Sequence, residues 1–166
     1  MERFIQKIIV PIDFSDASEA AARYAGRLAA SVGASVHLIH VLEEALLAPG
    51  PLEFYGGALP QAREEMYQGA CTRLNALGAA LANSGLPQFT AEVRSGVTAE
   101  EIADAVVDYG ADLVVMSTHG RSGLPHLLLG SVAERVIRTA RCPVLAIRGC
   151  GAPQKEAAVT ELPAVV

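Results

Sequence analysis

The sequence contains no run of basic residues and no long apolar stretch, and these absences exclude two classes of protein. Its formal net charge at pH 7 is −5, whereas a duplex-binding protein neutralises several phosphates with basic side chains, so nucleic acid is not an expected partner. The longest apolar runs have the length of a strand, far below the ~20 residues that a spanning helix needs. The first residues also lack the basic region and apolar run of a signal peptide. We therefore expect a cytoplasmic protein that does not bind a membrane.

Cysteine is also scarce. The three cysteines, Cys71, Cys142 and Cys150, have neither the spacing of metal ligands nor a C-x-x-C pattern. Cys71 falls within a helical pattern and Cys142 precedes a strand, so both are expected to behave as small buried apolar residues. Cys150 lies between glycines and is predicted to be an exposed thiol. No catalytic cysteine is expected.

The sequence does contain a regular alternation of strand and helix patterns. Hydrophobic residues make up 51% and charged residues 19% of its 166 residues, as is typical of one globular domain. Apolar runs predict strands at 7–13, 36–41, 89–93, 112–116 and 143–148, and helical periodicity predicts helices at 16–32, 61–84, 98–109 and 131–140, with a long loop at 43–60. The predicted fold is α/β: a single-domain, open parallel five-stranded sheet with helices on both faces. This domain is expected to cover residues 1–148 and to be followed by a tail, 149–166.

Local signals place the ends and the buried faces of the predicted helices. Glycines are expected to end three of them, at Gly33, Gly85 and Gly110. Capping boxes predict three helix starts, formed by Asp16 with Glu19, Thr98 with Glu101, and Ser131 with Glu134. The expected buried stripes are Ala17, Ala20, Ala21, Tyr24, Leu28 and Val32 in the first helix, Ala62, Met66, Ala70, Leu74, Leu77 and Leu81 in the second, and Ile102, Ala105, Val106 and Tyr109 in the third.

The best candidate for a ligand site is the glycine-rich segment from Ser117 to Ser131. In open parallel sheets ligands bind beyond the carboxyl ends of the strands, where the strand order reverses, which favours the loops after the first and fourth strands. Gly120, Gly123 and Gly130 would let a phosphate approach the main chain, and the helix that begins near Ser131 directs free N–H groups into the loop.

The same segment also has a simpler interpretation. A glycine-rich connection often serves only to turn the chain, and Ser131 is explained as an N-cap that accepts a hydrogen bond from the Glu134 amide. Arg121, by contrast, adds a positive charge to the segment, which favours phosphate binding. The segment matches neither GxxxxGK[ST] nor GxGxxG, which disfavours P-loop enzymes and dinucleotide-binding dehydrogenases. Taken alone, it leaves both interpretations open.

Three separated motifs together resemble the universal stress protein family. They are IIVPIDFS at 8–15, VVMSTHGRSG at 114–123 followed by LLLGSVAERV at 127–136, and CPVLAI at 142–147. The resemblance runs from about Lys7 to Arg148. ATP-binding members of the family carry the pattern G-x2-G-x9-G-[S/T], which falls here on Ser117, Gly120, Gly130 and Ser131, with serine in place of the first glycine.

The resemblance implies a Rossmann-like fold of the adenine nucleotide alpha hydrolase type and a site for ATP or AMP. The residues it implies are Pro11, Ile12, Asp13 and Val41 around adenine and ribose, and Met116, Ser117, His119, Gly120, Arg121, Gly130, Ser131 and Val132 around the phosphates. A divalent ion, Mg²⁺ or Mn²⁺, would be held by phosphate oxygens and water, since no carboxylate cluster adjoins the loop. Asp13 has an alternative role as a strand-end residue that caps the following turn.

Little in the sequence points to catalysis. His37 and His40 lie in a predicted strand and are interpreted as packed, His126 as solvated, and His119 as the one histidine placed near a phosphate. There is no Walker lysine and no evident general base, so no catalytic residue is assigned. The function expected is that of a regulatory stress-response protein with slow or no hydrolysis. The alternatives are an interaction module that binds no nucleotide and a weak ATPase.

The last predicted strand, 143–148, is the candidate contact between two copies of the protein. It is apolar, it has no internal lysine or proline, and in the family's strand order it lies at a sheet edge. The resemblance implies a homodimer joined through this strand, whereas a tail folded back from Gly149 would cover the edge instead. The sequence does not identify any other protein partner.

Overall fold

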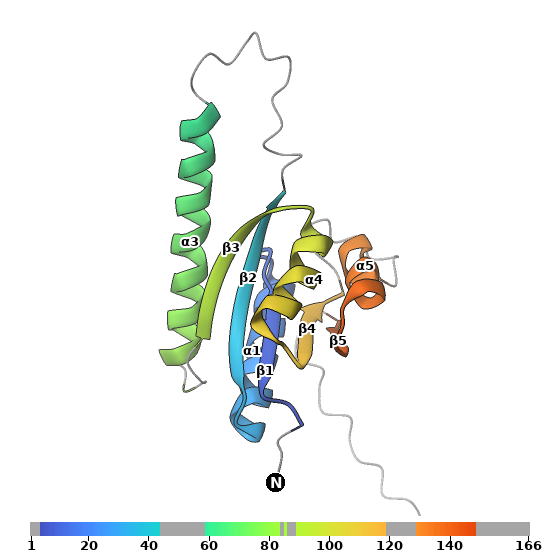
Figure 1. Ribbon diagram of the computed structural model, residues 1–166. Coiled ribbons are helices and arrows are strands. Elements are labelled where there is room, and N and C mark those ends of the chain that lie inside the picture. The colour runs from blue at the N-terminus through green and yellow to red at the C-terminus, as the bar shows by residue number, and fades with distance from the viewer. Residues whose placement is uncertain (1–3, 44–58, 84, 86–88, 119–128, 149–166) are drawn as a thin grey trace, which may run out of the picture.

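The computed structural model describes residues 4–43, 59–83, 85, 89–118 and 129–148, which form a parallel sheet with helices on both faces (Figure 1). The elements are β1 (Lys7–Pro11), α1 (Asp16–Val32), β2 (Ser35–Glu43), α3 (Leu59–Asn83), β3 (Phe89–Gly96), α4 (Thr98–Tyr109), β4 (Leu113–Ser117), α5 (Ser131–Thr139) and β5 (Val144–Ile147). The strand order is β3-β2-β1-β4-β5, and every neighbouring pair is parallel. The predicted fold class is therefore confirmed. The predicted tail, with Cys150, lies outside the described residues.

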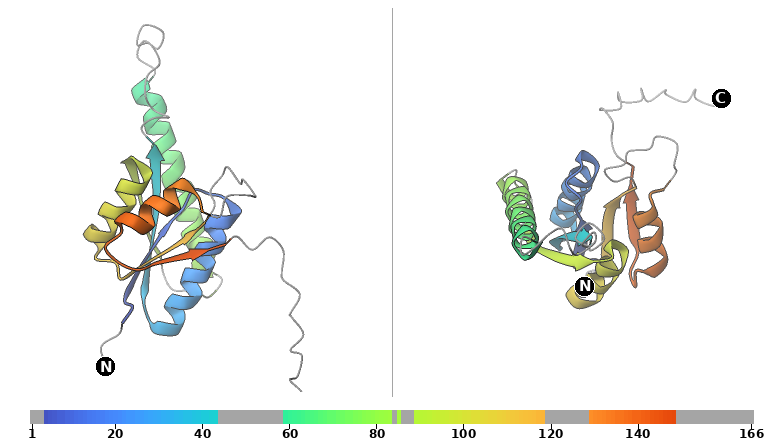
Figure 2. Two further views of the ribbon diagram at one scale, coloured as in Figure 1. Left: turned by 90° about the vertical axis from the view of Figure 1, so that its right-hand side faces the viewer. Right: turned by 90° about the horizontal axis from the view of Figure 1, so that it is seen from above.

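The central strand β1 shows why a continuous apolar run predicted a strand covered on both faces. Successive residues of a strand point to opposite faces, so Ile8 and Val10 pack against α1 and α3 while Ile9 packs against α4 and α5. All three side chains are fully buried. Seen from above in Figure 2, α1 and α3 lie on one side of the sheet and α4 and α5 on the other. None of the described helices is long and apolar enough to cross a membrane.

The start of α1 differs from its prediction by one residue. Ser15, not Asp16, is the N-cap, and its hydroxyl oxygen accepts a hydrogen bond from the Ser18 amide at 3.2 Å. Glu19 does not complete a capping box with Asp16. Its amide donates to the Ser15 carbonyl, and its carboxylate pairs with Arg23 on the solvent side. The predicted end is confirmed, because Gly33 adopts the left-handed conformation at φ 71°.

The buried face of α1 also differs from the predicted stripe. Of the six predicted residues only Ala21 is buried, and 48% of Tyr24 is exposed. The residues that face the sheet are the smallest ones, Ser18, Ala21, Ala22, Ala25, Gly26 and Ala29. Small side chains let the helix axis approach the strands closely, and this close approach outweighs the burial of larger side chains. Leu28 and Val32 then pack at the flank of the core.

This tight contact predicts that Ala25→Leu destabilises the protein. Ala25 has no exposed surface, so three added carbons have no space and the free energy of unfolding should fall by about 1–3 kcal/mol. Urea denaturation followed by circular dichroism measures the change. The matched control is Ala30→Leu on the exposed face of the same helix, where the effect should stay within about 0.5 kcal/mol. Equal stabilities for the two variants would contradict this account of the α1 interface.

Helix α3 extends beyond the sheet at its N-terminal end (Figure 1). Ala62 is therefore exposed and Met66 is 43% exposed, although both belonged to the predicted buried stripe. The stripe is correct further along, where Ala70, Leu74 and Leu81 are buried and Leu77 packs against the same core. The periodicity thus identified the correct face but not how much of the helix the sheet covers.

The capping boxes predicted for α4 and α5 do not form. The N-cap residues are Val97 and Gly130, neither with a side-chain cap, and Thr98 and Ser131 are the first helical residues. The Thr98 hydroxyl instead donates to Glu43 Oε1 at 2.8 Å. In α4 the predicted core residues Ile102, Ala105 and Val106 are buried, while Tyr109 is only half-buried.

The two described cysteines are half-buried free thiols. Cys71 lies within α3 and Cys142 just before β5, as predicted. Burial raises the pKa of the Cys142 thiol, and the nearby Asp112 carboxylate acts in the same direction, although a backbone hydrogen bond from Val114 opposes them. A raised pKa keeps the thiol protonated at neutral pH, which is the state of an unreactive cysteine.

Candidate functional site

A cleft lies at the carboxyl end of the sheet, where the strand order reverses. The chain continues from β1 to β2 on one side of β1, whereas β4 lies on its other side, and the helices α1 and α5 that follow β1 and β4 cover opposite faces of the sheet. The cleft has a volume of about 710 Å³, within the range of small-molecule sites. Among the described residues it is lined by Pro11, Ile12, Asp13, Phe14, Ser18, Ile39, His40, Val41, Leu42, Glu43, Met66, Gly69, Ala70, Arg73, Thr98, Ile102, Met116, Ser117, Thr118, Gly130, Ser131, Val132 and Ala133.

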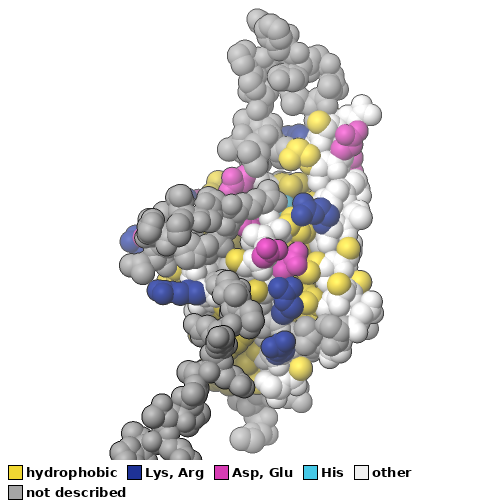
Figure 3. All heavy atoms as spheres, turned by 180° about the vertical axis from the view of Figure 1, so that it is seen from behind, with side chains coloured by type: hydrophobic (Ala, Val, Ile, Leu, Met, Phe, Trp, Pro, Cys, Tyr) yellow, Lys and Arg dark blue, Asp and Glu magenta, His cyan; other side chains and the backbone are white. Residues whose placement is uncertain are grey.

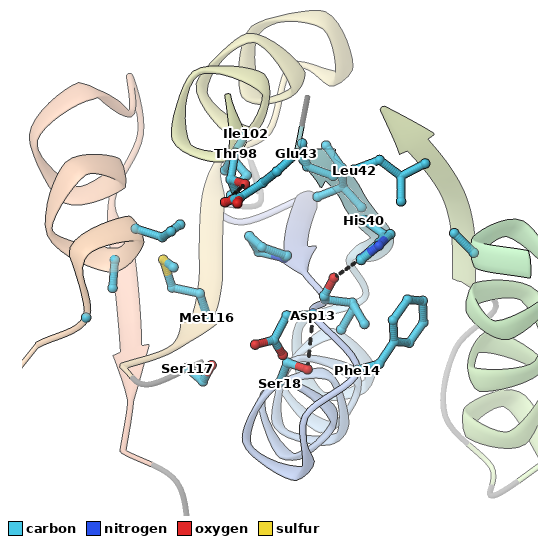
Figure 4. Close-up of a pocket in the computed structure, with 18 of the residues that line it drawn as sticks. Asp13, Phe14, Ser18, His40, Leu42, Glu43, Thr98, Ile102, Met116 and Ser117 are labelled. Carbon is cyan, nitrogen blue, oxygen red and sulfur yellow. Dashed lines mark hydrogen bonds between the residues drawn. The ribbon is translucent and has the colours of Figure 1, made fainter. Parts of the chain in front are cut away.

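The fold brings most of the predicted site residues together around this cleft (Figure 4). Those that line it are Pro11, Ile12, Asp13, Val41, Met116, Ser117, Gly130, Ser131 and Val132. They come from the ends of β1, β2 and β4 and from the start of α5. The other three predicted residues, His119, Gly120 and Arg121, lie outside the described residues.

The loop between β1 and α1 holds Asp13 in place. Asp13 Oδ1 accepts hydrogen bonds from the Ser15 amide at 3.0 Å and from the Ser15 hydroxyl at 2.6 Å. The turn-capping role of Asp13 is therefore observed. It is compatible with a ligand role because the same carboxylate borders the cleft. An anchored carboxylate can accept hydrogen bonds from an amino group or a sugar hydroxyl without first being ordered.

Phe14 follows Asp13 in a strained conformation. Its φ is 62°, and it is the one described residue other than glycine with a positive φ. Such a conformation costs of order 1–3 kcal/mol and is often found at functional sites. It turns the Phe14 ring toward α3, where the centroid of the ring lies 4.5 Å from that of the His40 ring (Figure 4). The guanidinium carbon of Arg73 lies 4.1 Å from the centroid of the Phe14 ring.

Ser117 occupies the position where the family pattern has glycine. It is the last residue of β4 and is not among the residues with positive φ. The backbone at this position therefore does not require glycine, and serine is unstrained there.

The amino end of α5 forms the opposite wall of the cleft. Gly130 is the N-cap, its amide donates to the Thr118 carbonyl at 2.8 Å, and its carbonyl accepts from the Glu134 amide at 2.9 Å. The proposed bond between the Glu134 amide and the Ser131 hydroxyl is therefore wrong, and the Ser131 hydroxyl does not cap the helix. The amides of the first helical turn have no intrahelical acceptor, and the helix dipole adds positive potential at the same place. This wall thus offers N–H donors and a hydroxyl to an anion.

Several residues of the cleft were missed from the sequence. Glu43 and Thr98 form a hydrogen-bonded pair beside the start of α4, and Met66, Gly69 and Arg73 come from α3. Glu43 was missed because β2 ends two residues beyond its predicted end, at Glu43, which pairs with Gly96 of β3. No local signal could have found the α3 residues, since only tertiary packing brings that helix to the cleft.

The two described histidines are packed, as predicted. His37 Nδ1 lies 2.8 Å from Thr90 Oγ1, and its ring stacks on Tyr109 with centroids 4.6 Å apart. His40 Nδ1 donates to the Ile12 carbonyl at 2.6 Å, which ties β2 to the loop after β1. Each is 8% exposed. No group of three or more His, Cys, Asp or Glu side chains in the described part of the chain is arranged to hold a metal ion.

Comparison with known proteins identifies relatives along nearly the whole chain. The universal stress protein family matches residues 5–148. Universal stress protein MJ0531 of Methanocaldococcus jannaschii is 36% identical over 155 residues, which cover 93% of this chain and 87% of the relative.

Solved structures of similar proteins share the fold. The structure of MJ0577, another universal stress protein of Methanocaldococcus jannaschii, matches with a TM-score of 0.76 and 25% identity over 92% of this chain and 99% of the other. A universal stress protein in complex with cAMP matches with a TM-score of 0.65 and 22% identity, covering 87% and 98% of the two chains. One from Archaeoglobus fulgidus in complex with dAMP matches with a TM-score of 0.55 and 21% identity, covering 87% and 98%.

Proposed function

The chain belongs to the universal stress protein family, and we propose that its cleft binds an adenine nucleotide, ATP or AMP. The observation that carries the proposal is the wall formed by α5. Its first-turn amides and the Ser131 hydroxyl border the cleft, and the hydroxyl is not used as a helix cap. The carboxylate of Asp13 and the Val41 region lie across the cleft, where adenosine would extend. The cAMP and dAMP complexes of structurally similar proteins support the choice of adenine.

Isothermal titration calorimetry of the full chain with ATP, AMP and GTP tests the proposal. Adenine nucleotides should bind with at least about tenfold higher affinity than GTP, a difference of about 1.4 kcal/mol. Mass spectrometry of nucleotide released by denaturing the purified protein gives an independent measurement. If ATP and AMP produce no heat and no adenine nucleotide is released, the protein is instead an interaction module that binds no nucleotide.

We expect bound ATP to be hydrolysed slowly or not at all, as in a regulatory protein. Arg73 is the one lysine or arginine among the described residues that line the cleft, and it lies on the α3 side, away from the α5 wall. A transferring phosphoryl group would thus receive little charge stabilisation from these residues. Any Mg²⁺ or Mn²⁺ would bind through phosphate oxygens and water. Steady-state release of phosphate faster than about 1 s⁻¹, the lower range of kinases, would contradict this expectation.

We further propose that the protein is a homodimer joined through β5. This strand is an edge of the sheet, and all four of its residues are half-buried. An unpaired apolar edge can pair with the same edge of a second copy across a two-fold axis. The cytoplasmic location expected from the sequence stays a prediction.

A further inference from the structure

The cleft extends past the proposed nucleotide site into a second part, which we call the α3 lobe. It is lined by Phe14, Leu42, Met66, Gly69, Ala70 and Arg73. Val41 and Val132 pack with the core beneath α4 and α5, whereas Phe14 packs with the core beneath α1 and α3. Figure 4 shows this division, with Met116 and Ser117 beside β4 and Phe14, His40 and Leu42 toward α3. No α3 residue belongs to the proposed nucleotide site, so the lobe has no assigned occupant.

Gly69 is an exposed residue of α3 that lines the lobe without a side chain of its own. It lies within α3, where glycine costs about 1 kcal/mol of helix stability relative to alanine. Packing does not require this glycine, because a Cβ added there would meet no atom within 4 Å. The other glycine in the helix, Gly78, differs because an added Cβ would contact Phe89 and Leu38 at 3.6 and 3.8 Å. A side chain at position 69, which lines the lobe, would therefore displace no described neighbour.

Arg73 supplies the positive charge and the N–H donors of the lobe. Arg73 is exposed, and its guanidinium carbon lies 4.1 Å from the centroid of the Phe14 ring, a cation–π contact. No carboxylate in the described part of the chain lies within ion-pair distance of it, in contrast to Arg94, which pairs with Glu92 and Asp108. A guanidinium held by its face keeps its N–H edge available for a planar anion.

The charges around the lobe favour a ligand with one negative charge over a ligand with two. Arg73 is its single lysine or arginine, and the carboxylates of Asp13 and Glu43 line the same cleft. A second charge on the ligand would lack a cation and would face these carboxylates. The remaining walls, Leu42, Met66 and Ala70, are apolar. On the face of the molecule shown in Figure 3, the visible acidic and basic side chains of the described residues stand in small mixed groups.

We propose that the α3 lobe binds a small carboxylate with an apolar or aromatic body. The carboxylate pairs with the N–H edge of Arg73, and the body lies over Gly69 between Met66, Ala70 and Leu42. This part of the cleft adjoins the proposed nucleotide site, and the proposal does not rest on nucleotide binding.

Phenylacetate is the probe, and phenylacetamide is its neutral analogue of the same shape. Titrations of the full chain followed by amide chemical shifts should move the signals of Gly69 and Ala70 and of Phe14. Phenylacetate should bind at least about tenfold more tightly than the amide, the ratio expected when a charge-assisted hydrogen bond is lost. Arg73→Gln should reduce that ratio to about one. The control, Arg27→Gln, removes an exposed arginine from α1, and the ratio should stay unchanged.

Gly69→Leu provides a second, independent test. Leucine fits the helix and meets no atom at its Cβ, so the variant should keep the circular dichroism spectrum of the wild type while phenylacetate affinity falls at least about tenfold. AMP affinity should not change in either variant, which separates this proposal from that of the nucleotide site. Equal binding of phenylacetate and phenylacetamide, or shifts confined to the first turn of α5, would overturn the proposal.

Discussion

Replacement of Gly130 by valine should weaken adenine nucleotide binding at least about 100-fold, or roughly 2.7 kcal/mol, while the fold stays intact. Gly130 has φ −73° and ψ 152°, an extended conformation that valine adopts readily. Its amide bond to Thr118 and its carbonyl bond to Glu134 are made by the main chain and survive the substitution. The added branched side chain would occupy the cleft beside the first-turn amides, where the proposed phosphate must approach. Calorimetry with ATP and AMP measures the loss.

Two further measurements make this result decisive. The far-UV circular dichroism spectrum of Gly130→Val should match that of the wild type, and the thermal midpoint should fall by only the few degrees that a poorer N-cap costs, which would exclude unfolding as the cause. Ser131→Ala is the graded control, because it removes one hydroxyl and adds no volume, so affinity should fall only about three- to tenfold. An unchanged affinity in Gly130→Val would place the nucleotide away from the α5 wall.

The fold was predictable because its signals are local. A strand buried on both faces appears as a continuous apolar run, and β1 and β4 were found in this way. Helix ends at Gly33 and Gly110 were also found, because only a left-handed residue closes those turns easily. The predicted ends of the strands were less accurate than their positions. Since β2 and β3 pair from Val36↔Phe89 to Glu43↔Gly96, each supports the other past the point where its own apolar pattern stops.

Helix starts and helix faces depended on contacts that the sequence does not display. The Thr98 hydroxyl would be a good cap in an isolated helix, but it donates to Glu43, a residue from another strand. On α1 the periodicity suggested a stripe that included Tyr24, yet the sheet selects the narrow alanine face because close packing requires small residues. Both errors arise where tertiary contacts outweigh local preference.

The candidate site was predictable in the parts that follow strands and at the start of α5. Asp13 and Met116 lie at strand ends next to the point where the strand order reverses, so topology alone brings them together. Arg73 and Gly69 lie in the middle of a long helix, and their sequence surroundings resemble those of any exposed helical residue. Their place at the cleft follows from the way α3 packs on β2 and β3, which no local motif encodes.

Ala146→Pro should convert the proposed homodimer to a monomer without unfolding the protein. The amide of Val114 donates to the Pro143 carbonyl and that of Thr118 to the Ile147 carbonyl, so the odd-numbered residues of β5 bond to β4. In a parallel ladder the amide of Ala146 must then point away from β4, toward the free edge. Proline at this position removes an outward donor that only a second copy would use, and its ring is tolerated on an edge strand.

Leu145→Pro is the matched comparison, because its amide points toward β4 and its loss breaks the ladder inside the sheet. This variant should be destabilised by about 3 kcal/mol or more, whereas Ala146→Pro should unfold near the urea midpoint of the wild type. Light scattering should report a dimer for the wild type and a monomer for Ala146→Pro. The protein concentration should be on the order of tens of micromolar, well above the Kd of a stable interface. If the wild type is already monomeric at that concentration, β5 is not a dimer edge. If Ala146→Pro stays dimeric, the two copies meet elsewhere, and the exposed Val107 and Ile137 of α4 and α5 become the next surface to alter.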